Sequence, residues 1–396
     1  MANIPPGKLS ESVLWRLPPS KSHMIRWLIL AYQSERDVTI KFNSAPGEDI
    51  LSTKKCLEIL GLDIEESDFS WKILGGKKEI SSSKITLNCG NSGTATNFLT
   101  ALAATMDKEV TIYGDESLKR RDFSELNNSL REMGCEISGN VVPFTVKGPI
   151  TKNTINISTE KSSQPLSAMI LSSPNHDQDI VIELQGEGVS RAYADLTINI
   201  AKKCGIEMFR DENLITVTSN NIEIPEIIEI PGENSLIPIA LLLSELHGVD
   251  FIIQNREQSE FLSQGIKMLD EAKFKIIDLR DYSDLITPAA ALLAIKNGGK
   301  ITGVGHTRGK ESDRIENTML LLKDFGIECT IKENDIEIRG AQIPIKPIKV
   351  VDTYNDHRIA MTAIALSTFT GGEILNPQIS SVTDPEFIEK INNILI

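Results

Sequence analysis

The sequence has few cysteines and no cysteine motif. None of them forms a C-x-x-C pair, and the five are scattered along the chain: Cys56, Cys89, Cys135, Cys204 and Cys329. An odd, dispersed set argues against a disulfide framework and against a thiolate zinc site. We therefore expect these cysteines to be small, buried hydrophobic residues.

Long apolar runs are also missing. No segment approaches the roughly 18 consecutive apolar residues that span a bilayer. Residues 1–15 (MANIPPGKLSESVLW) lack the basic stretch and apolar stretch of a signal peptide, so we expect a cytoplasmic protein. The 396 residues, 40% hydrophobic and 24% charged, are enough for two globular domains with their own cores.

The chain has no excess of basic residues, since its formal net charge is -14 at pH 7. Nucleic acids and anionic membranes attract proteins through broad basic patches, so neither is expected as a partner. A small anionic substrate remains compatible with this charge, provided that local lysines and arginines make a positive cleft.

The sequence does contain an internal repeat. Six segments open with small polar residues and continue as an apolar helix: SKSHMIRWLILAYQS, GNSGTATNFLTALAAT, SSQPLSAMILSSP, GENSLIPIALLLSEL, YSDLITPAAALLAI and YNDHRIAMTAIALST. A strand-like run follows most of them, and then a second amphipathic helix that ends at a glycine, as in CLEILGLDI and LLKDFGIEC. Alternating strands and helices predict an α/β (α+β) fold with two domains of three repeats each.

Two stretches interrupt this pattern and predict the domain crossovers. Pro18 and Pro19 break the chain before Ser20, and residues 220–234 (NNIEIPEIIEIPGEN) contain two prolines without a helical period. We therefore predict one domain over residues 20–223 and a second built from residues 1–19 plus 224–396. Two short connections make a hinge, and a cleft between domains is a common ligand site.

Each polar helix start is a potential anion site, because free backbone N–H groups and the helix dipole concentrate positive potential there. Ordinary N-capping by Ser, Asn or Asp explains any one start taken singly. At two of the starts, nearby cations favour an anion site over capping alone. Lys21, Ser22 and Arg26 cluster at the first, and Arg358 stands in the first turn of the last, where the dipole disfavours a cation.

For three other candidate site residues, a purely structural role also explains the sequence. Arg121 belongs to a basic run (LKRRDF) that is equally typical of a solvated face. Arg314 lies in HTRGKESDR, which also reads as a salt-bridged surface. Asp284 is either a helix cap or, if it faces the ligand, a base.

The motifs PSKSHMIR, GNSGTA, LKRRDF, SSQPLSA, SRAYADLT, SDLITPAAALL, KESDR and YNDHRIAM occur in the order and spacing of one known family. Over essentially its whole length the chain resembles the 5-enolpyruvylshikimate-3-phosphate (EPSP) synthases, the 3-phosphoshikimate 1-carboxyvinyltransferases of aromatic amino-acid biosynthesis. The resemblance implies two domains, each of three βαβαββ repeats about a pseudo-threefold axis (an inside-out α/β barrel), closing over substrates in the interdomain cleft.

The resemblance also implies an activity: the enolpyruvyl group of phosphoenolpyruvate passes to the 5-hydroxyl of shikimate 3-phosphate, and phosphate is released. It implies a monomer that needs no metal or organic cofactor. The domain over 20–223 is then mainly the shikimate 3-phosphate domain, and the other contributes phosphoenolpyruvate-binding and catalytic residues.

Site residues follow from the resemblance position by position. Those matching the shikimate 3-phosphate site are Lys21, Ser22, Arg26, Ser162, Ser163, Gln164, Ser190, Tyr193, Asp284 and Lys310. Those matching the phosphoenolpyruvate site are Lys21, Gly93, Arg121, Gln164, Arg314 and Arg358. By the same resemblance, Asp284 takes the proton from the attacking hydroxyl, and Glu311 with Lys21 handles the proton at the methylene carbon.

Three positions depart from the family pattern. Asn97 stands where an arginine is usual, Val382 where a gapless pairing places a lysine, and His306 where an asparagine is usual. Loss of two cations from a site for a trianion predicts weaker donor binding or a different donor geometry.

Two other functions are compatible with parts of this pattern. One is an enolpyruvyl transferase with another acceptor, a nucleotide or a UDP-sugar, but the loop GDESLKRRDF lacks the reactive cysteine expected of the UDP-sugar branch. The other is a non-catalytic binding protein on the same scaffold. Retention of Lys21, Asp284, Glu311, Arg314 and Arg358 argues against it.

Overall fold

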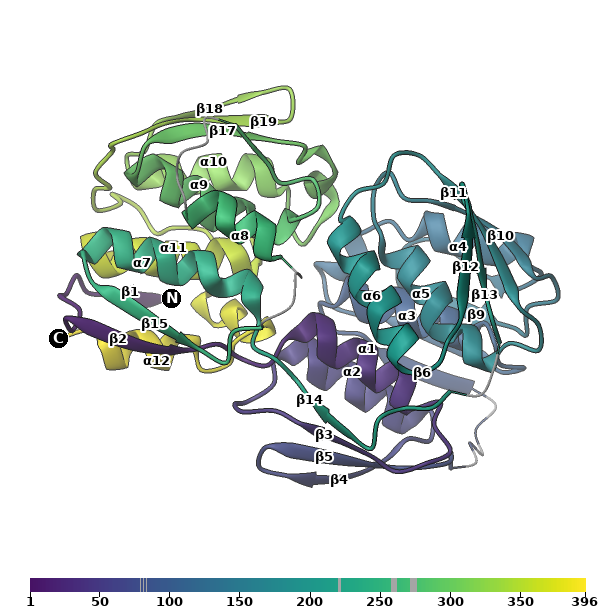
Figure 1. Cartoon of the computed structure of the whole chain (residues 1–396). Helices are drawn as coiled ribbons and strands as arrows, with labels where there is room; N and C mark the ends of the chain where they lie inside the picture. Colours follow the sequence, from purple (N-terminus) through teal and green to yellow (C-terminus); the bar gives the residue numbers. More distant parts are fainter. Residues whose placement is uncertain (79, 81, 83, 220–221, 258–261, 271–275) are drawn as a thin grey trace. The chain divides into compact units, whose positions relative to one another are not determined.

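The computed structural model describes residues 1–78, 80, 82, 84–219, 222–257, 262–270 and 276–396. The chain forms two compact units, which are coloured along the sequence in Figure 1. Unit 1 comprises Met1–Ser20, Ala45–Gly47 and Pro231–Ile396, and unit 2 comprises Lys21–Ser44 and Glu48–Ile230.

The second division of the chain falls at Ile230, later than the boundary at 223/224 that the prolines suggested. Residues 220 and 221, near which the crossover was expected, lie outside the described part of the chain. The later position has a structural cause: β14 (Ile227–Glu229) pairs in parallel with β3 (Val38–Lys41) and so completes a sheet of unit 2. The short piece Ala45–Gly47, which belongs to unit 1, was not anticipated from the sequence.

Unit 2 contains three four-stranded sheets that share one strand order. In each, the first two strands are parallel and the remaining neighbours antiparallel. The orders are β14-β3-β5-β4, β6-β7-β9-β8 and β10-β11-β13-β12. Besides β14 and β3, the strands are β4 (Asp63–Ser67), β5 (Ser70–Leu74), β6 (Lys84–Asn88), β7 (Glu109–Tyr113), β8 (Glu136–Ile137), β9 (Phe144–Lys147), β10 (Thr154–Ser158), β11 (Ile180–Gln185), β12 (Met208–Asp211) and β13 (Leu214–Val217).

Three of the predicted apolar helices form the interior of unit 2: α1 (Lys21–Ala31), α3 (Gly93–Ala103) and α5 (Gln164–Ser172). They are buried on nearly every face, as expected of helices without a polar side. Helix α5 contacts α1, α3 and the more amphipathic α6 (Arg191–Lys203). The other helices of this unit are α2 (Glu48–Ile59) and α4 (Ser124–Glu132).

Unit 1 repeats this plan. Helices α7 (Ile237–His247), α9 (Ile286–Ile295) and α11 (His357–Thr370) contact one another, and most of their residues are buried. The second helices are α8 (Ser263–Asp270), α10 (Arg314–Asp324) and α12 (Phe387–Ile394). One sheet, β16 (Ile276–Asp278), β17 (Gly298–Thr302), β19 (Asp335–Arg339) and β18 (Cys329–Lys332), has the order seen in unit 2.

Two strand pairs complete the described part of unit 1. Strand β15 (Asp250–Gln254) runs parallel to β2 (Ser12–Arg16), and β1 (Ala2–Ile4) runs antiparallel to β20 (Gly372–Ile374). The N-terminal segment therefore supplies strands to the C-terminal repeats. A backbone hydrogen bond of 2.8 Å from Ser20 N to Pro231 O ties the two crossover segments together.

The cysteines behave largely as the sequence predicts. Cys56, Cys89, Cys135 and Cys204 are buried and form no disulfide, whereas Cys329 is half-buried. Burial raises the pKa of the Cys135 thiol and of the Cys204 thiol to about 12. These thiols stay protonated at neutral pH, which makes them poor nucleophiles and metal ligands.

The ring of His176, just after α5, predicts a pH-dependent contribution to stability. It is buried against Ser172, whose Oγ lies 3.1 Å from Nε2, and burial lowers the pKa of His176 from 6.5 to about 4. The unfolded chain therefore binds a proton between these values that the folded chain does not, so stability falls as pH falls. From pH 7 to pH 5 this histidine should cost about 2 kcal/mol of unfolding free energy.

We expect His176→Gln to remove this part of the pH dependence. Urea unfolding of wild type and variant at pH 7 and pH 5 measures it, because other histidines contribute equally to both proteins and cancel in the difference. Equal losses on acidification in the two proteins would show that His176 is not the group responsible.

Candidate active site

Arg121 is held by side-chain contacts beside the backbone of Gly93, at the start of α3. Asn91 Oδ1 accepts from Arg121 Nη2 at 3.0 Å, and Asn91 Nδ2 donates to Asp115 Oδ2 at 3.1 Å. Ser117 Oγ lies 3.3 Å from the same Nη2. A Cβ at Gly93 would come within 2.8 Å of Arg121 Nη1, so only glycine lets the guanidinium lie this close. The contacts made by Asn91 and Asp115 were not predicted from the sequence.

Gln164, the first residue of α5, is linked by hydrogen bonds to α3. Its Nε2 donates to Thr94 Oγ1 at 3.0 Å, and its Oε1 accepts from Asn97 Nδ2 at 2.9 Å. The same Nδ2 also donates to Gly93 O at 3.0 Å. Three residues predicted around phosphoenolpyruvate, Gly93, Arg121 and Gln164, therefore lie together at the starts of two neighbouring helices.

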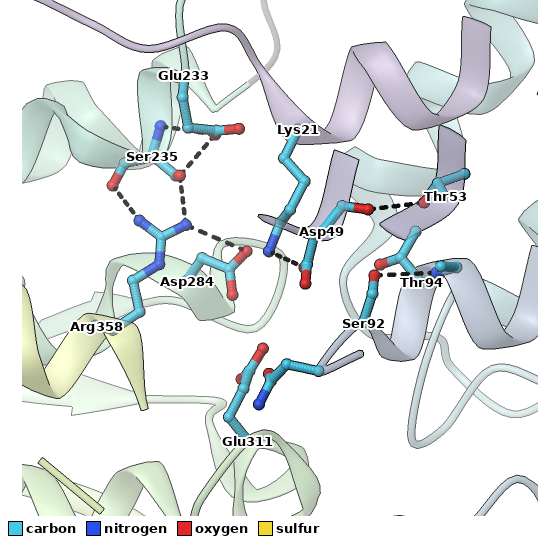
Figure 2. Close-up of polar contacts among 12 residues, drawn as sticks. Lys21, Asp49, Thr53, Ser92, Thr94, Glu233, Ser235, Asp284, Glu311 and Arg358 are labelled. Carbon is cyan, nitrogen blue, oxygen red and sulfur yellow. Dashed lines mark hydrogen bonds and ion pairs between the residues drawn. The ribbon is translucent and has the colours of Figure 1, made fainter. Parts of the chain in front are cut away.

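Lys21, at the start of α1, forms an ion pair with Asp49. Figure 2 shows the two side chains, whose Nζ and Oδ2 atoms lie 3.0 Å apart. Asp49 is in the first turn of α2, where the helix dipole stabilises a carboxylate, and its side chain is 5% exposed. Sequence reasoning missed Asp49, because an acidic residue at a helix start is typical of capping alone.

Arg26 is buried and ties α1 to α6. Its Nη1 donates to Ser22 O at 2.8 Å, and its Nη2 donates to Tyr193 O at 3.0 Å. Its Nε donates to Thr197 Oγ1 at 2.7 Å, and the guanidinium lies 5.3 Å from the ring centre of Phe98. The structure thus brings together Ser22, Arg26 and Tyr193, three residues predicted to bind shikimate 3-phosphate. Arg26 also has a packing role, because it joins α1 to α6 and to Phe98.

Besides Ser22 in α1, the predicted serines lie at the starts of α5 and α6. Ser163 is the N-terminal flanking residue of α5 and is buried, while Ser162 Oγ accepts from Gln164 N at 3.1 Å. Ser190 precedes α6 with a φ of 54°, in the left-handed region that non-glycine residues rarely adopt. Such strain is found where function requires a fixed side chain.

In unit 1, Arg314 gathers three carboxylates. Its guanidinium, 1% exposed, contacts Asp284 Oδ1 at 2.6 Å, Asp356 Oδ2 at 2.9 Å, and Glu311 Oε2. Burial works to lower the pKa of Arg314, but these carboxylates outweigh burial and hold that pKa well above its ordinary value. Asp356, which the sequence did not single out, also caps α11 by accepting from Arg358 N at 2.9 Å.

Arg358 is held by Ser235, as Figure 2 shows. Its Nη2 donates to Ser235 Oγ at 2.6 Å, and its Nη1 donates to Ser235 O at 3.1 Å. Ser235 Oγ in turn donates to the buried Glu233, with 2.6 Å to Oε1. The second oxygen of Asp284 lies 3.9 Å from Arg358 Nη2, so Asp284 lies between two guanidinium groups. Neither Glu233 nor Ser235 was predicted from the sequence.

His306 and Val382, two of the departures from the family pattern, add no charge. His306 lies in η5 (Gly305–Gly309), and burial, with a smaller effect of Lys310, lowers the pKa of His306 to about 4. At neutral pH it is therefore a neutral ring, comparable to the asparagine it replaces. Val382, at the end of η6 (Pro377–Val382), is 1% exposed, so its side chain belongs to the core of unit 1.

Across the described ranges, no helix combines the length and the apolar character required for crossing a membrane. Within those same ranges, no three His, Cys, Asp or Glu side chains are grouped so as to hold a metal ion.

Buried helices packed with sheets of one repeated strand order, and cations at the starts of α1 and α11, are typical of an α/β protein that binds a small anion. A family model described as EPSP synthase (3-phosphoshikimate 1-carboxyvinyltransferase) matches residues 4–258 and 239–391. Proteins named 3-phosphoshikimate 1-carboxyvinyltransferase from Methanocorpusculum labreanum and Methanobrevibacter smithii are each 30% identical, over 87% and 96% of this chain and 87% and 95% of theirs. The chain therefore belongs to the EPSP synthase family of transferases.

The solved structures agree on the fold. EPSP synthase from Acinetobacter baumannii matches with a TM-score of 0.78 at 21% identity, covering 99% of this chain and 98% of that one. The predicted fold, two domains of βαβαββ repeats in an inside-out α/β arrangement, is confirmed.

Proposed function

We propose that this chain transfers the enolpyruvyl group of phosphoenolpyruvate to the 5-hydroxyl of shikimate 3-phosphate and releases phosphate. Besides the family, one observation carries the proposal: Arg314 holds Asp284 and Glu311, the two carboxylates expected to move protons, on a single buried guanidinium. Fixing both groups on one rigid cation suits a reaction with two proton transfers.

The first step is addition. Asp284 removes the proton from the 5-hydroxyl, and the freed oxygen attacks C2 of phosphoenolpyruvate while its methylene carbon is protonated. The arginines on either side of Asp284 keep the carboxylate in place and balance its charge. The product of this step is a tetrahedral adduct that still carries the phosphate.

The second step is elimination. A proton leaves the new methyl group and the C2–O bond to phosphate breaks, which restores the double bond in the product. We assign the proton at this carbon to Glu311 with Lys21. Lys21 is an ammonium paired with Asp49 at 3.0 Å, so it combines a proton donor with a fixed position.

Charge neutralisation supports donor binding. Phosphoenolpyruvate is a trianion, and Lys21, Arg121, Arg314 and Arg358 supply positive charge with directed N–H groups. Each of the three arginines is already oriented by protein partners: Arg121 by Asn91, Arg314 by Asp356 and Arg358 by Ser235. Donors oriented in advance stabilise a charged adduct without reorganising during the reaction.

The proposal assigns the residues of both units to one reaction. The remaining acceptor contacts fall to Ser22, Arg26, Ser162, Ser163, Ser190, Tyr193 and Lys310. We propose further that the enzyme works as a monomer in the cytoplasm.

The test is phosphate release by purified protein with millimolar phosphoenolpyruvate. We expect release only when shikimate 3-phosphate is present, and none with a nucleotide or UDP-N-acetylglucosamine as the acceptor. Release with one of those acceptors instead would identify the other transferase reaction. Tight binding of shikimate 3-phosphate without any turnover would identify a binding protein.

Gly93→Ala should weaken donor binding selectively. The new Cβ would meet Arg121 Nη1 at 2.8 Å, and this atom ends a flexible side chain, so the guanidinium moves while the fold remains. We expect the KM for phosphoenolpyruvate to rise about tenfold as a charge-assisted contact is misplaced. Steady-state kinetics with each substrate varied measure this effect. An equal rise in the KM for shikimate 3-phosphate would contradict a donor-specific role.

A further inference from the structure

We propose that Asn97 is a positioning residue that fixes the side-chain amide of Gln164, so that Gln164 presents N–H and not C=O to the anionic donor. This inference rests on the proposed function and deepens it, because it assigns a task to an uncharged residue at a position where the family resemblance leads us to expect an arginine.

The orientation of Asn97 is set first. Its side chain is 7% exposed and projects from α3 beside the main-chain oxygen of Gly93, one turn earlier, at 3.0 Å. A carbonyl oxygen only accepts hydrogen bonds, so the amide nitrogen of Asn97, and not its oxygen, must face Gly93. The backbone of the helix therefore determines which way round this asparagine sits.

The orientation of Gln164 follows from that of Asn97. The atom of Gln164 that meets Asn97 Nδ2 at 2.9 Å must be an acceptor, which is Oε1. Nε2 then lies on the other branch and donates one hydrogen to Thr94 Oγ1 at 3.0 Å. An amide nitrogen carries two hydrogens, so a second N–H of Gln164 remains available to a ligand.

The neighbourhood explains why this orientation matters. Gly93 lies beside both groups, since a Cβ built there would be 2.8 Å from Arg121 Nη1 and 3.8 Å from Gln164 Oε1. An anion held by Arg121 is therefore close to the Gln164 amide. The Gln164 atom nearest the Gly93 position is Oε1, which already accepts from Asn97 Nδ2, so the polar group left for a ligand is the second hydrogen of Nε2. A rotated amide would turn its N–H groups toward Asn97 and would offer the anion an oxygen, which repels it.

The two amides thus form a chain from the backbone to the ligand. Gly93 O fixes which way the Asn97 amide faces, and Asn97 in turn fixes the orientation of the Gln164 amide. Gln164 then offers a neutral N–H donor beside the Arg121 guanidinium. An amide-to-amide hydrogen bond thus holds Gln164 without adding charge at position 97.

The experiment compares Asn97→Leu with a matched control, Thr100→Val. Leucine keeps the branching of the asparagine side chain at Cγ but donates to neither Gly93 nor Gln164. Thr100, one turn further along α3 and 1% exposed, loses a hydrogen bond of the same kind, to Thr96 O at 2.7 Å, without touching Gln164. We expect Asn97→Leu to raise the KM for phosphoenolpyruvate about tenfold, with kcat and the KM for shikimate 3-phosphate changed less than threefold. Thr100→Val should leave all three near wild type.

A double-mutant cycle separates positioning from a structural effect. If Asn97 acts through Gln164, Asn97→Leu should change the KM less than twofold in a Gln164→Ala background. The same tenfold change in that background overturns the proposal, and so does an unchanged KM in the single variant. Asn97→Ser replaces the leucine variant if the latter does not fold.

Failure of the proposed function is recognised separately. Absence of phosphate release by the wild-type protein contradicts the proposed reaction. Calorimetric titration with phosphoenolpyruvate then measures the dissociation constant for the wild type, the two single variants and the double variant of the same cycle. Equal dissociation constants for wild type and Asn97→Leu, or no measurable binding by either, overturn the positioning role.

Discussion

Replacing Asp284 by Asn is expected to lower kcat by about 10²- to 10⁴-fold, the usual contribution of a general base. Asparagine keeps the shape of the side chain and can still accept from Arg314 Nη1, but it cannot take the proton of the 5-hydroxyl. Arg314 retains Asp356 and Glu311 as partners, so the buried cation stays paired and the fold is kept. The dissociation constant for shikimate 3-phosphate should change about threefold at most.

The matched control is Asp313→Asn. Asp313 is also a carboxylate at a helix start and pairs with Arg308 at 2.7 Å, but it lies on the surface. Asparagine caps helices well, so the control should keep wild-type kcat. Turnover of Asp284→Asn within threefold of wild type would exclude Asp284 as the base and leave it as a helix cap.

Lys21→Met should have the second large effect, a fall in kcat of at least about 10²-fold, because both a proton donor and a charge-assisted contact are lost. Methionine keeps the length of the aliphatic stem. Removal of the lysine also leaves Asp49 buried without its cation, so unfolding must be measured beside the kinetics. A single-turnover reaction in deuterated water reports the step, since deuterium enters the methyl group of the adduct only if the methylene carbon is protonated.

Lys54→Met is the control for this experiment. Lys54 is a mostly buried lysine of α2 with ion pairs of its own, 2.6 Å to Glu66 and 3.0 Å to Glu58, and it matches none of the predicted site positions. A loss of stability without a loss of kcat is expected there. Asp49→Asn should fall between wild type and Lys21→Met, because the ammonium remains but is less well held. Equal kcat for Lys21→Met and Lys54→Met would leave Lys21 without a catalytic role.

Sequence alone predicted the parts of this protein that local signals encode. Polar helix starts followed by apolar runs gave six inner helices, and alternating helices and strands gave the α/β class. Lys21 and Arg358 were found because a cation near a helix start has few structural explanations, whereas Arg121 was assigned through the family resemblance. Gly93 and Gln164 came from the family motif.

Residues whose role depends on a partner far along the chain were not found in this way. In the sequence, Asp49 and Asp356 look like helix caps. In the structure, Asp49 Oδ2 lies 3.0 Å from Lys21 Nζ, and Asp356 Oδ2 lies 2.9 Å from Arg314 Nε. Ser235 and Glu233 orient Arg358 from more than a hundred residues away. No local pattern marks such pairs, because each member is an ordinary residue for its own segment.

The repeat, the inner helices and the family could be predicted from the sequence, because they depend on periodicity, capping and motif order within short segments. Which groups share a hydrogen bond became clear from the folded chain. There β14 completes a sheet of unit 2, which puts the boundary at Ile230, and Asn97 of α3 binds Gln164 of α5. Hydrogen bonds are directional and act over about 3 Å. Their pairing is therefore fixed only when packing has brought distant segments into contact.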